Sequence, residues 1–349
     1  MGQPNTYYAD SASGNDANDG SSGSPWQTIQ GALDQINKGP NGDALILRNT
    51  APYSVPAQLS YASYGDPGLG QPIWITGCTI EPGDGGQATI NCPAGLQDEG
   101  KNDWHLESLI IDSKGYTGRT AYANTNSSIV NCQILGRVAF NSGVVYCSYF
   151  QQPESTGNTV FENFSTATIK YCVFESRQSG SISSLIDLNS NFSRLSNSLV
   201  IGRVDATRLI ETNGLWAGVD SCTLIGTAGS TAIVATANER QQPIIGNVFS
   251  GFDTVYDGGP IEPDCLVFNK FHNCNHVTGG NVELLGTVRH NTNQTLVSDP
   301  FVSASNGDYR LSISDELTVG GYPFSGSPGG VGVSNGGGPS GYSLARLAQ

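Results

Sequence analysis

The sequence predicts an all-β protein whose chain winds into a solenoid of parallel strands, with coils of about 25 residues. Two observations predict this fold. A short apolar phrase centred on Cys or Asn returns at a nearly constant interval, and a second series of apolar pairs runs between its occurrences. Self-similarity at a period of about 20 to 50 residues is typical of stacked repeats, in which each coil buries its apolar face on its neighbours. The alternative all-β fold, an open β-sandwich, gives no reason for a constant interval.

The repeated phrase is VVYCSYF at 144–150, IKYCVF at 169–174, LSNSLV at 195–200, VDSCTL at 219–224, IIGNVF at 244–249 and LVFNKF at 266–271. An apolar residue follows each central Cys or Asn two positions later, so the two side chains share one face of a strand. We expect the central residues to stack along one inner column, because Cys is small and readily buried and Asn can bond to the coils above and below. The predicted column, evenly spaced except for a slightly shorter last step, is Cys147, Cys172, Asn197, Cys222, Asn247 and Asn269.

Adjacent apolar pairs mark a second strand in each coil. Two neighbouring residues cannot both point inward on a flat strand. Either one member of each pair emerges as an outward stripe that a partner covers, or the strand bends and buries both members. The pairs are Val160/Phe161, Leu185/Ile186, Leu209/Ile210 and Ile233/Val234.

Composition argues against two classes of partner. A net charge of −14 without a basic stripe argues against nucleic acid, and no apolar run is long enough to span a membrane.

The opening residues lack the basic start and apolar core of a secretory signal. Eight cysteines would suit disulfides in a secreted chain, but Asn alternates with Cys in the predicted column, so of the eight cysteines we expect the three in that column to be reduced and buried. None has metal-ligand spacing, the nearest group being His272, Cys274 and His276.

Residues 24–36 carry the one convincing helix signal. Ser24 is expected to be the N-cap and Pro25 the first helical residue, with Gln27 completing a capping box. An amphipathic helix here would cap the apolar end of the first coil, whose first strand is expected at 43–48. The apolar face of the helix consists of Trp26, Ile29, Leu33 and Ile36.

Both ends of the chain resemble a known superfamily. The opening runs from Tyr7-Tyr8 through SPWQTIQGA at 24–32 to GDALILR at 42–48, and QPIWITG follows at 71–77; DPFV at 299–302 and NGDYRL at 306–311 form the closing phrase. These segments are similar to those of right-handed parallel β-helix proteins of the pectin-lyase-like superfamily. The resemblance implies a right-handed coil. It leaves function open, because the superfamily includes polysaccharide lyases, glycoside hydrolases, phage tailspikes and non-catalytic structural proteins.

Three segments are expected along the chain. Residues 1–40 form an N-terminal loop and capping helix, 41–312 the parallel β-helix, and 313–349 a Gly-rich tail. The period is irregular before Cys147, where Cys132 precedes it by much less than one regular coil, so a short coil or an irregular turn is required. The tail ends in an apolar-basic segment expected to dock on this or a neighbouring chain through Tyr342, Leu344, Arg346 and Leu347.

One row of charged side chains is a candidate for chemistry. Carboxylates recur at the same place on three successive coils, with Ala235 on the fourth, and arginines lie nearby. Stacked carboxylates about 5 Å apart repel, share a proton, bind a cation or face arginines. They could serve a lyase with calcium and an arginine base, or a glycosidase pair; the alternative is an exposed acidic ladder softened by water and salt. The candidate catalytic residues are Glu162, Asp187, Glu211, Arg203 and Arg208.

The Asp/Asn-rich loop at 15–20 raises the hypothesis of a calcium site. However, Ala17 occupies a ligand position, and Asx turns explain the composition as well. We therefore expect no metal and no cofactor, with Ca2+ the one cation to consider.

The sequence favours a non-catalytic β-helical protein of a larger assembly, a phage-type virion decoration, fibre or spike subunit made in the host cytoplasm. No local cluster of acids matches the superfamily's enzymes. The expected partners are other subunits, as a homotrimer or as capsid or tail proteins, and a glycan is a candidate ligand. The alternative is an extracellular polysaccharide lyase or glycoside hydrolase acting on an acidic polysaccharide, although the charge of −14 makes a polyanion harder to attract.

Overall fold

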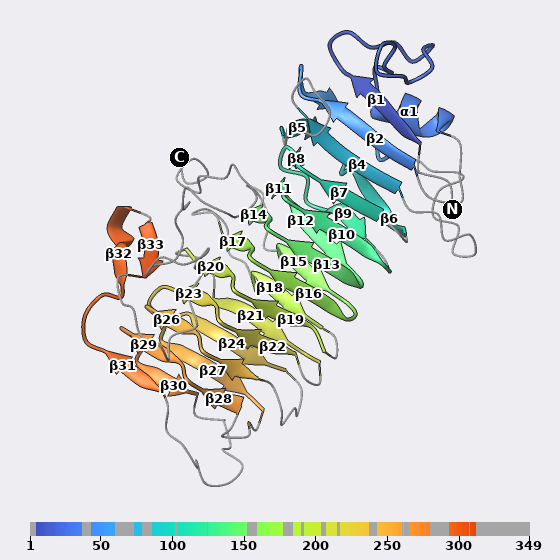
Figure 1. The fold of residues 1–349 in the computed structure, drawn as a ribbon. Coiled ribbons are helices and arrows are strands. Elements are labelled where there is room, and N and C mark those ends of the chain that lie inside the picture. The colour runs from blue at the N-terminus through green and yellow to red at the C-terminus, as the bar shows by residue number, and fades with distance from the viewer. Residues whose placement is uncertain are drawn as a thin grey trace. The chain divides into compact units, whose positions relative to one another are not determined.

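The computed structural model shows the chain as two compact units. Unit 1 comprises Met1–Thr156 and Val160–Ala167, and unit 2 comprises Gly157–Thr159 and Thr168–Gln349. In each unit the chain contributes successive strands to three parallel sheets in turn, as Figure 1 shows. The structure describes residues 5–36, 43–59, 73–78, 86–101, 104–123, 125–151, 159–176, 184–189, 192–203, 207–214, 217–236, 243–259, 261, 265–279, 293–306 and 308–311.

In unit 1 the strands follow one another within each sheet in chain order. The first sheet contains β1 (Thr6–Asp10), β2 (Asp43–Arg48), β4 (Ile73–Cys78), β7 (Trp104–Glu107), β10 (Ser127–Val130) and β13 (Gly143–Tyr146). The second contains β3 (Tyr53–Ser54), β5 (Ala88–Asn91), β8 (Leu109–Asp112), β11 (Gln133–Leu135) and β14 (Tyr149–Gln151). The third contains β6 (Gln97–Lys101), β9 (Arg119–Ala123), β12 (Arg137–Phe140) and β15 (Phe161–Asn163).

Unit 2 repeats this arrangement. Its first sheet contains β16 (Ala167–Lys170), β19 (Arg194–Ser196), β22 (Gly218–Asp220), β25 (Ile244–Ile245) and β28 (Leu266–Val267). Its second contains β17 (Val173–Glu175), β20 (Leu199–Ile201), β23 (Thr223–Ile225), β26 (Val248–Ser250), β29 (Lys270–His272) and β31 (Gln294–Leu296). Its third contains β18 (Ile186–Leu188), β21 (Arg208–Thr212), β24 (Thr231–Ala235), β27 (Thr254–Gly258) and β30 (His276–Thr278). A separate antiparallel pair, β32 (Phe301–Ser303) and β33 (Asp308–Leu311), flanks the short 3-10 helix η2 (Ala304–Asn306).

The strand register confirms the parallel β-solenoid and its coil length. In unit 2, Ile169 pairs with Leu195, Leu195 with Val219, and Val219 with Ile244, so each pairing advances the chain by one coil of the predicted length. In unit 1, Ile129 pairs with Val145, a much shorter step along the chain. The irregular spacing before Cys147 is therefore a short coil and not a turn.

The inner column next to the first sheet differs from the predicted one at two positions. Cys147 and Asn197 adopt left-handed backbone angles, with φ of 50° and 48°, in the turn between the first and second sheets. Their side chains are half-buried, and the next residues, Ser148 and Ser198, turn inward and are buried. The Ser148 and Ser198 hydroxyls accept the backbone N–H groups of Cys132 and Cys172, one coil before them. In unit 2 the buried column is Cys172, Ser198, Cys222, Asn247 and Asn269, with the half-buried Asn293 continuing it.

The adjacent apolar pairs are buried at both positions. Leu185 and Ile186 are fully buried, and so are Leu209 and Ile210. The chain bends at Leu185, just before β18, whereas Leu209 and Ile210 both lie within β21. The register matches Ile210 with Ile233, so the fourth pair is Ala232/Ile233, and Val234 lies half-exposed beside Glu211. Both members of each pair are buried, so the pairs form no outward apolar stripe.

The N-terminal segment contains one strand that was not predicted, and its helix is shorter than predicted. The first strand is β1, which pairs in parallel with β2, so the strand at 43–48 is the second. Helix α1 (Ile29–Gln35) begins after the N-cap Thr28, whose side chain accepts the N–H of Gly31. Ser24 and Pro25 are not helical, because the backbone of Trp26 is bonded to β1 as extended chain. The predicted apolar face is buried, at Trp26, Ile29, Leu33 and Ile36.

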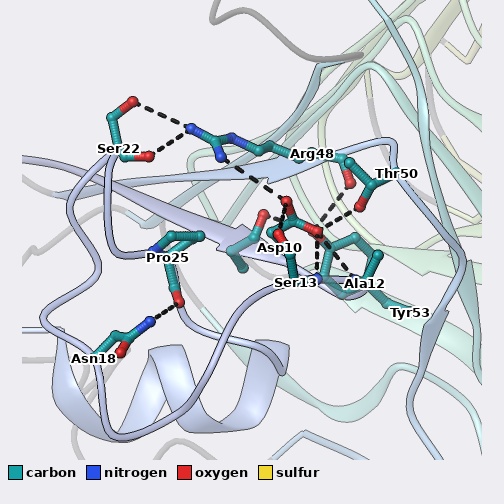
Figure 2. A network of polar contacts seen from close by, with 10 residues as sticks. Asp10, Ala12, Ser13, Asn18, Ser22, Pro25, Arg48, Thr50 and Tyr53 are labelled. Atoms are coloured by element: carbon teal, nitrogen blue, oxygen red, sulfur yellow. Dashed lines mark hydrogen bonds and ion pairs between the residues drawn. The ribbon is translucent and has the colours of Figure 1, made fainter.

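Asp10, the last residue of β1, fixes the turn that leads to this helix. Its carboxylate accepts the N–H groups of Ala12 and Ser13 and the hydroxyls of Ser13 and Thr50, as Figure 2 shows. Burial alone would raise the pKa of Asp10, but these hydrogen bonds together lower it below its ordinary value. The network ties the turn after β1 to Thr50, which follows β2.

Candidate functional site

A compact group of charged and aromatic side chains lies on the outer face of the third sheet in unit 1. It comes from three neighbouring strands, β9, β12 and β15. The register pairs Arg119 with Arg137 at the strand starts and places Ala139 between Tyr122 and Glu162. Because Ala139 is small and fully buried, the longer side chains on either side can reach one another above it. We call this group the arginine cluster; it consists of Arg119, Tyr122, Arg137, Glu162 and Phe164.

Two guanidinium groups converge on one carboxylate in the arginine cluster. Arg137 Nη2 donates to Glu162 Oε1, and Arg119 Nη2 lies 3.5 Å from Glu162 Oε2. The Glu162 side chain is only 11% exposed, against 33% for Arg119. The Nε of Arg137 is buried and has no hydrogen-bond partner among the described residues. The cluster thus has two positive charges to one negative charge, in a chain whose net charge is −14.

Aromatic rings border the same cluster. The guanidinium carbon of Arg119 lies 5.2 Å from the centre of the Tyr122 ring and 5.3 Å from that of Phe164, distances typical of cation–π contacts. The two rings pack edge to face with their centres 6.4 Å apart. Phe164 is exposed, which is unusual for a large apolar side chain on a sheet. The cluster therefore offers positive charge and aromatic surface together to solvent.

The remaining predicted carboxylates lie in unit 2. Asp187 of β18 pairs in register with Glu211 of β21, on strands whose backbones lie about 4.8 Å apart. Arg208 Nη1 lies 3.4 Å from Glu211 Oε2, an exposed ion pair. Val234 and not Ala235 follows Glu211 in the row, since Ala235 pairs with Thr212. Glu162 belongs to unit 1 and meets Arg119 and Arg137 there.

Arg203 does not join the carboxylate row. Its guanidinium donates from Nε to Glu175 Oε1 at 2.8 Å, and its backbone N–H donates to the Ser176 hydroxyl. Glu175 ends β17 in the second sheet, whereas Asp187 and Glu211 are in the third. Arg203 thus pairs with a carboxylate of the second sheet of unit 2 and not with the carboxylates of the third sheet.

The Asp/Asn-rich loop at 15–20 uses its side-chain oxygens on its own backbone. Asp16 accepts the N–H groups of Gln27 and Thr28, Asp19 accepts that of Ser21, and Asn15 accepts that of Ala17. Among the described residues there is no group of three or more His, Cys, Asp or Glu side chains that could hold a metal ion. The calcium hypothesis remains a prediction without a site assigned to it.

Two further segments were singled out in the sequence, the group at His272–His276 and the C-terminal tail. His272, the last residue of β29, has its Nδ1 3.0 Å from the Ser250 hydroxyl, and Cys274, between β29 and β30, donates to the backbone carbonyls of Phe249 and His272. The predicted docking tail, Tyr342, Leu344, Arg346 and Leu347, lies outside the described residues. Within the part of the chain that is described, no helix has the length and apolarity needed to cross a bilayer.

Sequence reasoning missed Arg119, Tyr122, Arg137 and Phe164. The signal that could have found them is weak, because Arg119 and Arg137 stand closer together in the sequence than one regular coil, in the region of irregular coils. The spacing of Arg119 and Arg137 in the sequence follows from the irregular coil length. The constant interval that identified the carboxylate row is therefore missing in this region.

No protein-family model matches this sequence, and no curated protein matches it. Among solved structures, the crystal structure of pectate lyase Pel9A aligns with a TM-score of 0.52 and 13% identity, over 99% of this chain and 96% of that chain. A rhamnogalacturonan lyase aligns with a TM-score of 0.40 and 11% identity, over 86% and 91% of the two chains. A GH136 lacto-N-biosidase from Eubacterium ramulus aligns with a TM-score of 0.38 and 10% identity, over 80% and 68%. At these identities the likeness to Pel9A concerns the fold alone, a parallel β-helix.

Proposed function

We propose that this chain is a non-catalytic β-helical structural protein that binds a glycan through the arginine cluster. The observation that carries the proposal is the joint exposure of Arg119 and Phe164 beside the buried carboxylate of Glu162. Guanidinium groups bind carboxylates and hydroxyls in directed hydrogen bonds, and an aromatic ring packs against the apolar face of a sugar. The fold shared with a pectate lyase makes saccharides the first ligand class to test.

The arrangement of the carboxylates supports a binding role over a catalytic one. Glu162 has a guanidinium at each of its oxygens, Glu211 faces Arg208, and Glu175 faces Arg203. A general acid or base must reach the proton that it moves, within about 3.2 Å of the substrate atom. Glu162, which is engaged on both oxygens by arginines of its own protein, is poorly placed for that task.

As its biological setting we propose a larger particle, in which the chain is a virion decoration, fibre or spike subunit. A stacked solenoid suits this role, since each coil buries its backbone hydrogen bonds on the next and leaves few segments for proteases. Antibodies raised against the chain should label the surface of the assembled particle in negative-stain images. Labelling of soluble protein alone would contradict this setting.

The binding proposal is tested with a panel of neutral and acidic oligosaccharides in isothermal titration. Arg119→Gln is expected to weaken binding about tenfold or more, because a hydrogen bond to a charged group contributes about 1.5–3 kcal/mol. Phe164→Ala should weaken it as well without disturbing Glu162. The control is Arg194→Gln, which removes an exposed arginine paired with Asp220 on another sheet. Equal affinities for all four proteins would refute the role of the cluster.

The alternative function, a polysaccharide lyase or glycoside hydrolase, is favoured by one observation. Asp187 and Glu211 are register partners on adjacent strands whose backbones lie about 4.8 Å apart, a spacing that permits the carboxyl separation of about 5–5.5 Å of retaining glycosidases. The same polysaccharide panel is incubated with the protein and followed by size-exclusion chromatography. Depolymerisation that disappears in the Asp187→Asn/Glu211→Gln double variant would replace the structural proposal with the enzymatic one.

A further inference from the structure

The outer face of the second sheet in unit 2 is largely apolar and covered. Its outward residues alternate with the core residues of β17, β20, β23 and β26. In unit 1 the outward residues of the corresponding strands β5, β8 and β11 are half-exposed and include Thr89, Gln133 and Asp112. An outer sheet face normally meets water, so a buried apolar one requires a cover. The buried outward residues of these strands are Val173, Leu199, Ile201, Thr223 and Val248, together with the polar Glu175 and Ser250.

The C-terminal hairpin β32–β33 supplies part of that cover. Phe301 is buried against Val248, and Ala304 and Tyr309 pack on the same pair together with Ile225. Phe301 and Tyr309 also stack edge to face with their ring centres 5.7 Å apart. The two strands form a sheet of their own and join none of the solenoid sheets. Side-chain packing therefore holds the described part of the hairpin to the solenoid.

The connection between solenoid and hairpin is open to solvent. After β31, Val297 is fully exposed, and Ser298 and Asp299 are exposed as well. Asp299 accepts the N–H of Phe301 and so starts the hairpin. An exposed linker of this kind can change direction at little cost.

We infer that β32–β33 is an exchangeable strap, which covers the outer face of the second sheet in its own chain and can cover the same face of a second copy. A two-stranded hairpin is marginally stable in water, so it needs an apolar face on which to dock. The face of a second copy offers the same contacts, so exchange replaces each contact with an identical one. The balance between closed monomer and exchanged assembly is then set by linker geometry and protein concentration. This inference does not rest on the proposed glycan binding.

A cysteine pair across the docked surface tests the exchange. Ile225→Cys and Ala304→Cys place one thiol on the sheet and one on the hairpin, both packed against Val248 and Phe301. In a chain that carries both changes, a short bismaleimide should link the two thiols within one molecule. The link is detected as a loss of free thiols while the protein still migrates as a monomer on a denaturing gel. This double variant is the control for geometry.

Exchange of the hairpin between chains is measured in a mixture of the Ile225→Cys and Ala304→Cys single variants. The chains are combined at high concentration, warmed until the hairpin opens, cooled and treated with the same reagent. We expect a covalent heterodimer on a denaturing gel, increasing with protein concentration, and only the wild-type background from either variant alone. Internal joining of the double variant without any heterodimer from the mixture would overturn the exchange. If the double variant forms no cross-link within one chain, the docking of β32–β33 on its own second sheet would be contradicted as well.

Discussion

At the scale of single residues, burial controls the chemistry of the cysteines. Removal from water raises the pKa of Cys92 and of Cys132 to about 12, and that of the half-buried Cys147 to about 11. Burial also raises the pKa of Cys222, and backbone donors only partly offset this effect. Since the thiolate is the nucleophile, all four thiols should react slowly at neutral pH. All four are free thiols in the structure.

The first prediction concerns the order in which these thiols react. With iodoacetamide at pH 8, Cys147 should be labelled several-fold faster than Cys132 and Cys222, because it is half-exposed and its pKa is raised least. Peptide mapping by mass spectrometry follows each site over time. In urea the three rates should become similar, which controls for local sequence. Labelling of Cys222 as fast as Cys147 in the folded protein would contradict the inner column.

A second prediction concerns the carboxylate of the arginine cluster. Glu162→Gln leaves Arg119 and Arg137 side by side without an anion, and should lower the free energy of unfolding by about 2 kcal/mol. We reduce this value from that of a fully buried pair, because both arginines are partly exposed. Urea denaturation measures the change. The matched control is Glu211→Gln, whose exposed pair with Arg208 should contribute less than about 0.5 kcal/mol. Equal effects of the two variants would show that Glu162 is not a buried counter-ion.

The inner column shows how far residue-level reasoning extends. The repeat at Cys172, Cys222, Asn247 and Asn269 predicted positions that the structure places in the column. Cys147 and Asn197 match the same pattern of letters, but each stands one residue early, in the left-handed turn position. Ser, Asn and Cys are all small and polar enough for either position. The pattern therefore cannot distinguish the turn from the column by residue type alone.

At the scale of elements, the asparagine ladder links neighbouring coils of unit 2. Asn247 Oδ1 accepts the N–H of Cys222, and its side-chain amide donates to the carbonyl of Val219 and to Asn269 Oδ1. Asn269 accepts the N–H of Asn247 in the same way. Asn247 is completely buried, so each of these bonds satisfies a group that water cannot reach.

The third prediction follows from that ladder. Asn247→Ala leaves the N–H of Cys222 and the carbonyl of Val219 without their partners, and should cost about 2–4 kcal/mol in stability. Ser198→Ala removes one acceptor, for the N–H of Cys172, and should cost about half as much. Both are read from shifts in the urea midpoint at constant pH. A larger loss for Ser198→Ala than for Asn247→Ala would show that the ladder does not stabilise the coils.

Local sequence signals did not predict the residue at which the N-terminal helix begins. Ser24-Pro25 has the residue types of a helix start, yet the chain there is extended and bonded to β1, and Thr28 is the cap. The N–H and carbonyl of Trp26 complete backbone pairs that the first strand of the sheet would otherwise lack. Local capping signals cannot anticipate this long-range pairing. The apolar face was predictable because burial depends on spacing and not on the cap.

At the scale of the whole chain, periodicity predicted the fold but not the candidate site. Where coils are regular, as from Ile169 to Ile244, the interval alone gives the register. Where they are not, as at the short coil between Ile129 and Val145, no repeat is visible in the sequence. The arginine cluster belongs to this irregular region. The boundaries expected at 40 and 312, the right-handed coil, the partners and the setting of the protein stay predictions.

The last prediction concerns alkaline stability, to which buried groups throughout the chain contribute. Burial raises the pKa of the thiols Cys92, Cys132 and Cys222 above 9.0, and that of the phenol of Tyr309 above 10.0. In the unfolded chain these groups ionise near their ordinary pKa values, while in the folded protein they stay neutral. The stability that they contribute is therefore fully present below about pH 9 and is lost as the pH rises toward the folded pKa values, at about 1.4 kcal/mol per pH unit for each group.

The urea midpoint should accordingly be nearly constant from pH 7 to about 8.5 and fall steeply from about pH 9 to 11. Cys132→Ser tests the cause, because a serine hydroxyl does not titrate in this range. The variant should start less stable at pH 7, since its hydroxyl is buried, but lose less stability between about pH 9 and 11. Tyr309→Phe should flatten the profile only above about pH 10, where the phenol ionises in the unfolded chain. Parallel profiles for the wild type and both variants would mean that these groups are as hydrated in the folded protein as in the unfolded chain, contrary to the packing of the coils and of the hairpin.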